Sequence, residues 1–174
     1  MPKTQQLISA EEIKQKVDQF AAILEAVYQG EELVVVMVMK GAFCLTADLI
    51  RGMKIPLTIE TIRASSYGQG GTQRGELTIT GLTDIELTGK NVLVIDDIID
   101  SGTTLAQIVA KIGEKKPKSV KSLVLLSKNV PRAIDYSPDF VLFDIENQFV
   151  VGYGLDYKEL YRNLPGIYLY SEDS

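Results

Sequence analysis

A continuous run of apolar, mostly β-branched residues, LVVVMVM at 33–39, constrains the fold more than any other feature of this sequence. A strand with one face in water alternates apolar and polar residues, so an unbroken run predicts a strand that is buried on both faces. Such strands are typical of parallel sheets that helices cover on both sides. Four more strands are predicted at 56–63, 91–95, 120–126 and 140–145.

Three amphipathic helices are predicted among these strands. Residues 9–12, SAEE, have the spacing of a capping box, and apolar residues at helical intervals predict a helix at about 10–28. Residues 42–51 suit a second helix, and the spacing of the apolar residues after 104 predicts a third. Strands that alternate with helices predict an α/β fold of three layers, and we expect one domain over residues 1–174.

The composition excludes several kinds of site. The sequence has no histidine, which excludes a Ser-His-Asp triad and any histidine-ligated metal. Its one cysteine, Cys44, excludes an intrachain disulfide and a multi-cysteine zinc site, and we expect it to be a small buried residue. The formal net charge of −5 argues against a nucleic-acid partner, although Mg²⁺ can bridge an acidic protein to a polyphosphate.

The hydropathy pattern gives no sign of a membrane protein. The longest wholly apolar run, at 33–39, is too short to cross a bilayer, and the first residues lack the apolar centre of a signal peptide. We therefore expect a cytoplasmic protein without a membrane partner.

Three aspartates follow the apolar strand at 91–95, and a small polar turn, SGTT at 101–104, follows them. Ligands of parallel sheets bind outside the carboxyl ends of the strands, where Asp96 and Asp97 are expected. A small-residue loop before a helix presents unpaired N–H groups to an anion, and Gly102 lets the backbone approach it closely. The pattern predicts a phosphate cradle flanked by carboxylates.

Other interpretations of this segment explain less. Asp100 or Ser101 as a simple helix cap would account for one residue, but not for the adjacent carboxylates Asp96 and Asp97. The segment lacks the G-x-x-x-x-G-K-[ST] pattern of a P-loop. The paired acids of a response regulator would follow the first strand, whereas these follow the third.

The stretch VLVIDDIIDSGTT at 92–104 resembles the phosphoribosyl-diphosphate (PRPP) motif of type I phosphoribosyltransferases, and is most similar to that of the hypoxanthine-guanine family. Further segments resemble this family in the same order along nearly the whole chain: VMKGAFCLTADL, ASSYG, LLSKNVPR, QFVVGYGLDY and YRNLPGI. The resemblance implies a three-layer fold with a central, mostly parallel five-stranded sheet, a small hood and a flexible lid hairpin. The hood would comprise the N-terminal segment and about 148–174.

The reaction implied by the resemblance is a glycosyl transfer of purine salvage. Ribose 5-phosphate moves from PRPP to hypoxanthine or guanine, which gives IMP or GMP and diphosphate, with Mg²⁺ as cofactor. By resemblance, Asp96 and Asp97 accept hydrogen bonds from the ribose hydroxyls and hold Mg²⁺. The family often has Glu at the first of these positions, so the distance to the ion could differ here.

The 5′-phosphate and diphosphate sites are also assigned by resemblance. Residues Asp100, Ser101, Gly102, Thr103 and Thr104 match the 5′-phosphate loop, and Asp100 matches the general base or acid at purine N7. Residues Lys40 and Gly41 match the diphosphate loop, with a non-proline cis peptide at Met39–Lys40, and Arg162 matches a second diphosphate ligand. The alternative for Lys40 is a solvated charge at the end of a strand, and the alternative for Arg162 is an ordinary surface arginine; neither would bind diphosphate.

The purine site follows in the same way. Lys128 would donate to the 6-oxo group, Phe149 would stack on the ring, and Val150 would contact the purine edge through its backbone. Asp156 would lie near the 2-position and a second Mg²⁺. Without the resemblance, Phe149 would be taken for a core residue and Asp156 for a turn residue.

A glycine-rich hairpin at about 64–81 is expected to form the lid. Ser66 and Tyr67 match the tip of the family's closing loop, and closure would exclude water. The alternative is an ordinary exposed hairpin.

Two rival functions remain open at this point. One is a xanthine-preferring enzyme, since preference at the 2-position depends on backbone geometry near Val150 and Asp156. The other is a non-catalytic PRPP-binding regulator, which the acidic charge and the presence of Asp100 disfavour. The resemblance also implies a homodimer or homotetramer.

Overall fold

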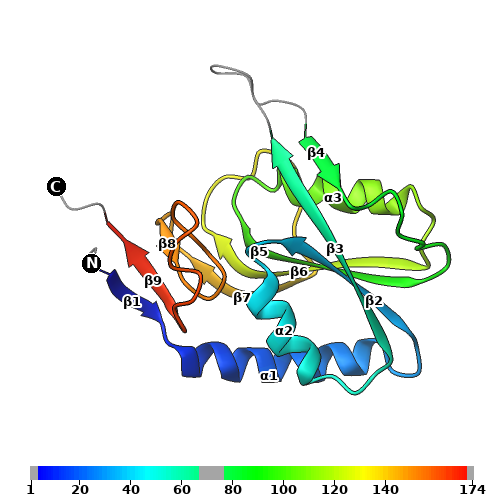
Figure 1. The fold of residues 1–174 in the computed structure, drawn as a ribbon, viewed down its shortest axis with the longest axis horizontal. Coiled ribbons are helices and arrows are strands. Elements are labelled where there is room, and N and C mark those ends of the chain that lie inside the picture. Colours follow the sequence, from blue (N-terminus) through cyan, green and yellow to red (C-terminus); the bar gives the residue numbers. More distant parts are fainter. Residues whose placement is uncertain (1–3, 67–76, 172–174) are drawn as a thin grey trace.

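The computed structural model describes residues 4–66 and 77–171, which form a larger and a smaller β-sheet with helices packed on the larger one (Figure 1). The strands of the larger sheet, in spatial order, are β4 (Leu77–Thr80), β3 (Leu57–Ser66), β2 (Leu33–Met39), β5 (Asn91–Ile99), β6 (Ser119–Lys128) and β7 (Phe140–Ile145). The helices are α1 (Ala10–Val27), α2 (Phe43–Arg51) and α3 (Thr103–Gly113). The smaller sheet has the order β1 (Thr4–Ile8), β9 (Ile167–Tyr170) and β8 (Val150–Val151).

The central sheet confirms the predicted parallel arrangement. Strands β3, β2, β5, β6 and β7 are parallel to their neighbours, and β4 adds an antiparallel strand at the edge of β3. The predicted bounds of β2 and β7 agree with the structure. β5 continues to Ile99, past the predicted end at 95, so Asp96 and Asp97 belong to the strand itself.

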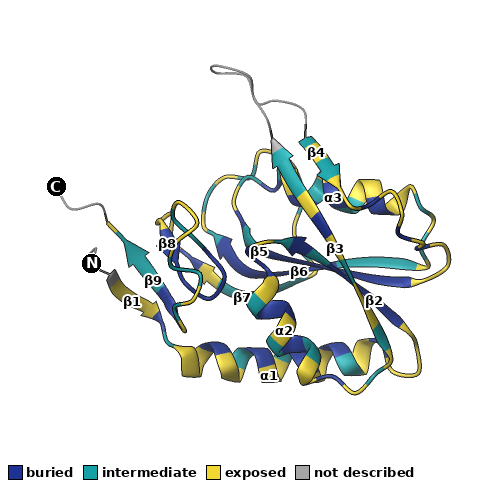
Figure 2. Cartoon of the chain, viewed as in Figure 1, coloured by how far each residue is buried: buried dark blue, intermediate teal, exposed yellow. Residues whose placement is uncertain are grey.

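Helices cover both faces of the sheet, which gives the three predicted layers. Apolar residues of α1 and α2 pack with Leu93 and Ile95 of β5 in one core, whereas α3 packs with Val92 and Val94 in the other. This alternation is the period of two of a strand that is buried on both faces. Figure 2 shows the middle strands mostly buried and the outer side of α1 exposed.

The smaller sheet lies at one end of the molecule in Figure 1, and its strands were not among the predicted elements. β1 and β8 both pair antiparallel with β9, so the two ends of the described chain meet in one sheet. These strands are short, and their partners are far away in the sequence, so local periodicity carries little sign of them.

The glycine-rich segment is described in part. The end of β3 pairs antiparallel with β4, from Arg63 opposite Thr80 to Ser66 opposite Leu77. The tip of the expected lid, at 67–76 and including Tyr67, lies outside the described residues, as does the side chain of Ser66. No helix within the described ranges is long and apolar enough to cross a membrane.

Candidate functional site

The candidate site begins where the carboxyl ends of β2 and β5 meet. The loop after β2 contains a cis peptide bond at Met39–Lys40, as the resemblance implies. Gly41 in this loop lies against the side chain of Asp97. A Cβ atom on Gly41 would be 1.6 Å from Asp97 Oδ2, far inside van der Waals contact, so glycine is what allows this approach.

Asp96 and Asp97 form an adjacent pair of carboxyl groups with little access to water. Burial, and then the charge of Asp97, raises the pKa of Asp96 well above its ordinary value, and burial raises the pKa of Asp97. Local backbone N–H groups donate to both: Asp97 N to Asp96 Oδ1 at 2.9 Å and Ile98 N to Asp97 Oδ1 at 2.7 Å. Two such groups at a strand end are suited to a bound cation or to hydroxyl donors.

The loop from Asp100 to Thr104 leads from β5 into α3 without a side-chain cap. The N-cap residue is Gly102, which has a left-handed backbone with φ of 85° that glycine adopts without strain. No side chain caps the helix, and only a long contact of 3.5 Å joins Thr103 N to Ser101 Oγ. The helix-cap interpretation of Asp100 is therefore wrong, and the first N–H groups of α3 remain suited to bind an anion.

Arg132 holds this loop in place, and the sequence alone did not single it out. Its guanidinium donates to the backbone carbonyl of Asp100 and, at 2.9 Å, to Ser127 Oγ. Ala133 N also donates to the Ser101 carbonyl at 3.0 Å. Only the segment LLSKNVPR hinted at such a role, since Arg132 lies four residues after Lys128.

Lys128 lies at the same edge, at the end of β6. Ile99 of β5 pairs with Ser127 of β6. Asp100 and Lys128 are the next residues of these two parallel strands, so they lie at the same end of the sheet. Lys128 lines a cavity of about 320 Å³ together with residues of the β6–β7 edge, among them Arg132 and Glu146. Asp100 is exposed beside this edge.

Arg162 and Lys40 form a network with acidic residues of the segment after β8. Arg162 lies 2.8 Å from Asp156 Oδ1 and donates to the Gly154 carbonyl at 2.7 Å. Glu159 accepts from Lys40 at 2.6 Å and lies 3.4 Å from Arg162. The alternative of a surface arginine does not fit Arg162, whose side chain is largely buried, whereas Lys40 is partly exposed and the structure leaves its alternative open.

Asp156 is occupied by protein groups at both oxygens. Besides Arg162 at Oδ1, the backbone N–H of Glu159 donates to Oδ2 at 2.8 Å. The part of the chain that the structure describes contains no cluster of three or more Asp, Glu, His or Cys residues that could hold a metal. Asp156 is therefore not gathered into one cluster with Asp96 and Asp97.

Phe149 is half exposed and lies in a group of aromatic rings rather than in the core. Its ring centroid is 5.8 Å from those of Tyr157 and Tyr170, in edge-on arrangements. Its carbonyl accepts from Tyr170 N at 3.0 Å, while the adjacent Val150 is buried in β8. The core interpretation of Phe149 is wrong, and the accessible ring is suited to stacking.

Tyr153 links the segment after β8 to α2, a contact that no local sequence pattern predicts. Its buried hydroxyl donates to Asp48 Oδ2 at 2.7 Å, although 105 residues separate the two. Burial and the bond to Asp48 raise the pKa of Tyr153, so the hydroxyl keeps its proton. This bond connects the part that carries Arg162 to the helix that follows Gly41.

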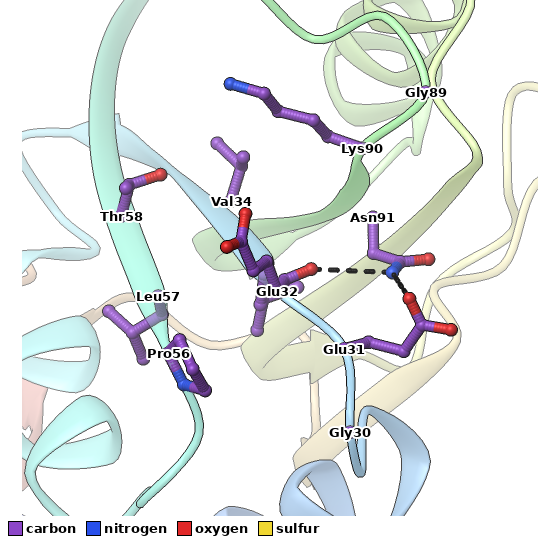
Figure 3. A pocket seen from close by; sticks show the side chains of 11 residues that line it. Gly30, Glu31, Glu32, Val34, Pro56, Leu57, Thr58, Gly89, Lys90 and Asn91 are labelled. Atoms are coloured by element: carbon purple, nitrogen blue, oxygen red, sulfur yellow. Dashed lines mark hydrogen bonds between the residues drawn. The ribbon is translucent and has the colours of Figure 1, made fainter.

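A further cavity, of about 490 Å³, lies at the opposite edge of the sheet (Figure 3). It is lined at the amino ends of β2, β3 and β5, where Asn91 donates to Glu31 at 3.3 Å and to the Glu32 carbonyl at 3.4 Å. None of the described residues proposed from the sequence as site residues lines this cavity.

Comparison with known proteins gives consistent matches. The family described as the phosphoribosyl transferase domain matches residues 3–158. The chain is 41% identical over 168 residues to hypoxanthine-guanine phosphoribosyltransferase of Aquifex aeolicus, which covers 96% of this chain and 94% of that protein. It is 44% identical over 161 residues to the enzyme of that name from Bacillus subtilis, with 92% and 89% covered.

The fold is matched as well. A crystal structure of a hypoxanthine-guanine phosphoribosyltransferase from Bacillus anthracis superposes with a TM-score of 0.89 at 42% identity. The match covers 98% of this chain and 99% of that one. An alignment this complete includes both sheets.

Proposed function

This chain belongs to the family of phosphoribosyl transferase domains, and we propose on that premise that it is a purine-salvage enzyme, transferring the 5-phosphoribosyl group of PRPP to hypoxanthine or guanine. The products would be IMP or GMP and diphosphate. One observation carries the proposal: the strand that carries the buried Asp96 and the half-buried Asp97 near its end leads through a left-handed glycine into a helix without a side-chain cap.

The loop 100–104 would bind the 5′-phosphate. Its support is the N-terminus of α3, where backbone N–H groups and the hydroxyls of Ser101, Thr103 and Thr104 are available to an anion. Arg132 and Ala133 hold the loop through the carbonyls of Asp100 and Ser101, so these contacts do not use the N–H groups that would bind the ligand. A cradle that is rigid before binding costs little ordering on binding.

Asp96 and Asp97 would accept hydrogen bonds from the ribose hydroxyls. Both are largely desolvated, and neither makes a salt bridge within the described residues, so donors from the sugar and a divalent cation both fit. Mg²⁺ held there would neutralise charge that develops on the leaving diphosphate. Asp156 could assist a second ion only by giving up part of its contact with Arg162 or Glu159.

The purine would bind between Lys128 and Phe149. An ammonium donor at Lys128 favours a 6-oxo acceptor over a 6-amino group, which would face it as another donor. Phe149 offers an accessible ring face, and the Val150 backbone would meet the purine edge. Asp100, exposed beside Lys128, would exchange the proton at N7, because the chain has no histidine to do so.

Lys40, Gly41 and Arg162 would hold the diphosphate. One support is that Gly41 has no side chain, which lets the backbone come close to a neighbouring group. The other is that the Arg162 guanidinium is already oriented by Asp156 and by the Gly154 carbonyl. Ser66 and Tyr67 would close over it as part of the lid, which remains a proposal from the sequence. Closure would keep water from the reacting carbon.

We also infer a cytoplasmic enzyme that assembles as a homodimer or homotetramer. Highly charged substrates such as PRPP are retained inside the cells that make them, and symmetric homo-oligomers are the commonest assemblies. Size-exclusion chromatography with light scattering would distinguish these assemblies from a monomer.

A spectrophotometric assay tests the proposed reaction. PRPP is mixed with hypoxanthine, guanine, xanthine or adenine, with and without Mg²⁺. We expect turnover with hypoxanthine and guanine that depends on Mg²⁺, and little with adenine. Turnover with xanthine alone would support the xanthine-preferring alternative. PRPP binding without turnover of any base would support the regulator.

A further inference from the structure

Glu159 contacts both cations that are proposed to bind diphosphate. Its Oε2 accepts from Lys40 Nζ at 2.6 Å, and its Oε1 lies 3.4 Å from Arg162 Nη2. Lys40 lies 119 residues away in the sequence, so the fold itself creates this contact. The hydrogen bond from Lys40 lowers the pKa of Glu159, and the carboxylate is therefore charged at neutral pH.

A carboxylate between a lysine and an arginine occupies the donors that a phosphate oxygen would use, since both anions accept from the same groups. We propose that Glu159 is an internal placeholder for diphosphate: it pairs with Lys40 and Arg162 in the empty enzyme and is displaced when PRPP or diphosphate binds. The inference rests on the proposed function, which assigns these two cations to the diphosphate, and it adds a residue that competes with the substrate.

Among the ion pairs of Lys40 and Arg162, those with Glu159 are the ones that a ligand can break most easily. Its side chain is 64% exposed and that of Lys40 is 45% exposed, whereas that of Arg162 is only 18% exposed. Ion pairs exposed to water are weak, because solvent competes for both charges. Arg162 keeps Asp156 and the Gly154 carbonyl when Glu159 leaves, so the diphosphate would meet an arginine that is still oriented.

The backbone places Glu159 at this position. Lys158, Glu159 and Tyr161 have φ angles of 51°, 67° and 74°, in the left-handed region that residues other than glycine seldom adopt. The bond from Glu159 N to Asp156 Oδ2 fixes the turn beside Arg162. The main chain therefore stays anchored while the exposed side chain is free to rotate into water.

The charges around the site make displacement necessary. Lys40 and Arg162 carry two positive charges, and Glu159 and Asp156 carry two negative ones, so the empty network is nearly neutral. A diphosphate that entered with Glu159 in place would meet a carboxylate at its own binding position. Competition of this kind weakens the binding of PRPP and hastens the release of diphosphate, because the carboxylate returns as the product leaves.

Titration calorimetry with sodium diphosphate, with and without Mg²⁺, tests the inference on the full chain. Glu159→Gln keeps the size of the side chain and removes its charge, so we expect diphosphate to bind about two- to fivefold more tightly, the range expected for loss of an exposed ion pair. The gain should disappear when Lys40→Met is added. The matched control is Glu114→Gln, which removes the charge from an exposed ion pair of 3.0 Å with Lys111 at the C-terminal end of α3 and should leave binding unchanged.

The sign of the change decides the outcome. Weaker diphosphate binding by Glu159→Gln would mean that Glu159 orients Lys40 for the ligand, and unchanged binding would mean that it does not compete; either result overturns the inference. No binding by any variant, wild type included, would overturn it together with the diphosphate assignment of Lys40 and Arg162. The transferase assay is independent of these titrations, so it reports separately whether the proposed reaction takes place.

Discussion

At the scale of single residues, Asp100 combines a fixed backbone with an exposed side chain. The Arg132 guanidinium holds its carbonyl, while the residue is exposed at the carboxyl edge of the sheet, where Asp100 and Lys128 follow paired residues of β5 and β6. A group that exchanges protons with a bound base needs this combination of fixed position and access. Neither observation could be obtained from the motif alone, because the motif gives the residue and not its environment.

Asp100→Ala should lower kcat by about 10²–10⁴-fold, the usual contribution of a general acid or base, and change KM for PRPP far less. The backbone contact from Arg132 does not depend on the side chain, so the loop should persist. Steady-state kinetics with PRPP and hypoxanthine measure both constants. The control is Asp135→Ala, which removes an exposed aspartate of the loop between β6 and β7. Unchanged turnover in Asp100→Ala would remove Asp100 from the chemistry.

Lys128→Ala should lower kcat/KM for hypoxanthine by about 10- to 100-fold, since hydrogen bonds to charged groups contribute about 1.5–3 kcal/mol. Most of the loss should fall on KM for the base, and KM for PRPP should change little. The comparison variant is Lys121→Ala, on the same strand but away from the cavity that Lys128 lines. If the two variants had equal kinetics, Lys128 would not contact the purine.

At the scale of elements, the site depends on how closely the loop after β2 approaches the end of β5. Gly41 follows β2, and Asp97 belongs to the neighbouring strand β5; their contact leaves no room for a Cβ atom on Gly41. The geometry of the loop proposed to bind diphosphate thus depends on the position of Asp97, which is proposed to bind the ribose hydroxyls. A small shift in one should be felt by the other.

Gly41→Ala should therefore raise KM for PRPP and cost about 1–3 kcal/mol of stability, as overpacking does elsewhere. Thermal unfolding and PRPP kinetics measure the two effects. Gly113→Ala is a matched control, because a Cβ atom at that position of α3 meets no atom within 4 Å. The control should be as stable as the wild type or slightly more so. Equal behaviour of the two variants would show that the loop adjusts without cost.

The elements also mark the limits of prediction from sequence. β2 was bounded correctly because all its residues are apolar, and β7 because apolar residues lie at both of its ends, with Asp144 as its one charged residue. β5 was predicted to stop at 95, because Asp96 and Asp97 suggest a loop, yet main-chain pairing with β6 continues to Ile99 regardless of side chain. The strands of the small sheet were not predicted one by one, since the pairing of β1 with β9 joins opposite ends of the chain, but the hood implied by the resemblance comprises these same two ends.

The same reason explains which site residues were missed. The motif gave Asp96, Asp97 and the loop 100–104 because they are consecutive in sequence. The contacts of Glu159 with Lys40, Tyr153 with Asp48 and Arg132 with the Asp100 carbonyl join distant segments. No local pattern encodes such contacts, so only the fold reveals them.

At the scale of the whole molecule, charge and substrate must be reconciled. The chain carries a formal net charge of −5, and its proposed substrate is a polyanion. Lys40 and Arg162 pair with Glu159 and Asp156, which should limit the attraction of unrelated anions to this part of the site. A divalent cation at Asp96 and Asp97 would add the positive charge that the protein lacks. Selection of PRPP over simple phosphate would then rely on engaging several parts of the site together.

Stability is also a property of the whole fold, and Tyr28 links it to alkaline pH. Tyr28 ends α1 in the core, and its buried hydroxyl has no hydrogen-bond partner within the described residues. Burial, and then the negative charge of Asp139, raises the pKa of Tyr28 to about 12. The phenolate is thus disfavoured in the folded chain.

The sign of the effect follows from proton binding. Above the ordinary tyrosine pKa of about 10, the unfolded chain releases the Tyr28 proton while the folded chain keeps it up to about pH 12, so the free energy of unfolding falls as pH rises through this interval. The free energy of unfolding of the Tyr28→Phe variant should fall less steeply in this pH interval. At pH 7 the variant should be at least as stable as the wild type, because it lacks the unpaired buried hydroxyl. Urea unfolding at pH 7, 10 and 11 measures both differences. Parallel curves for the two proteins would mean that Tyr28 titrates alike in the folded and unfolded chains, and that its hydroxyl finds water within the core.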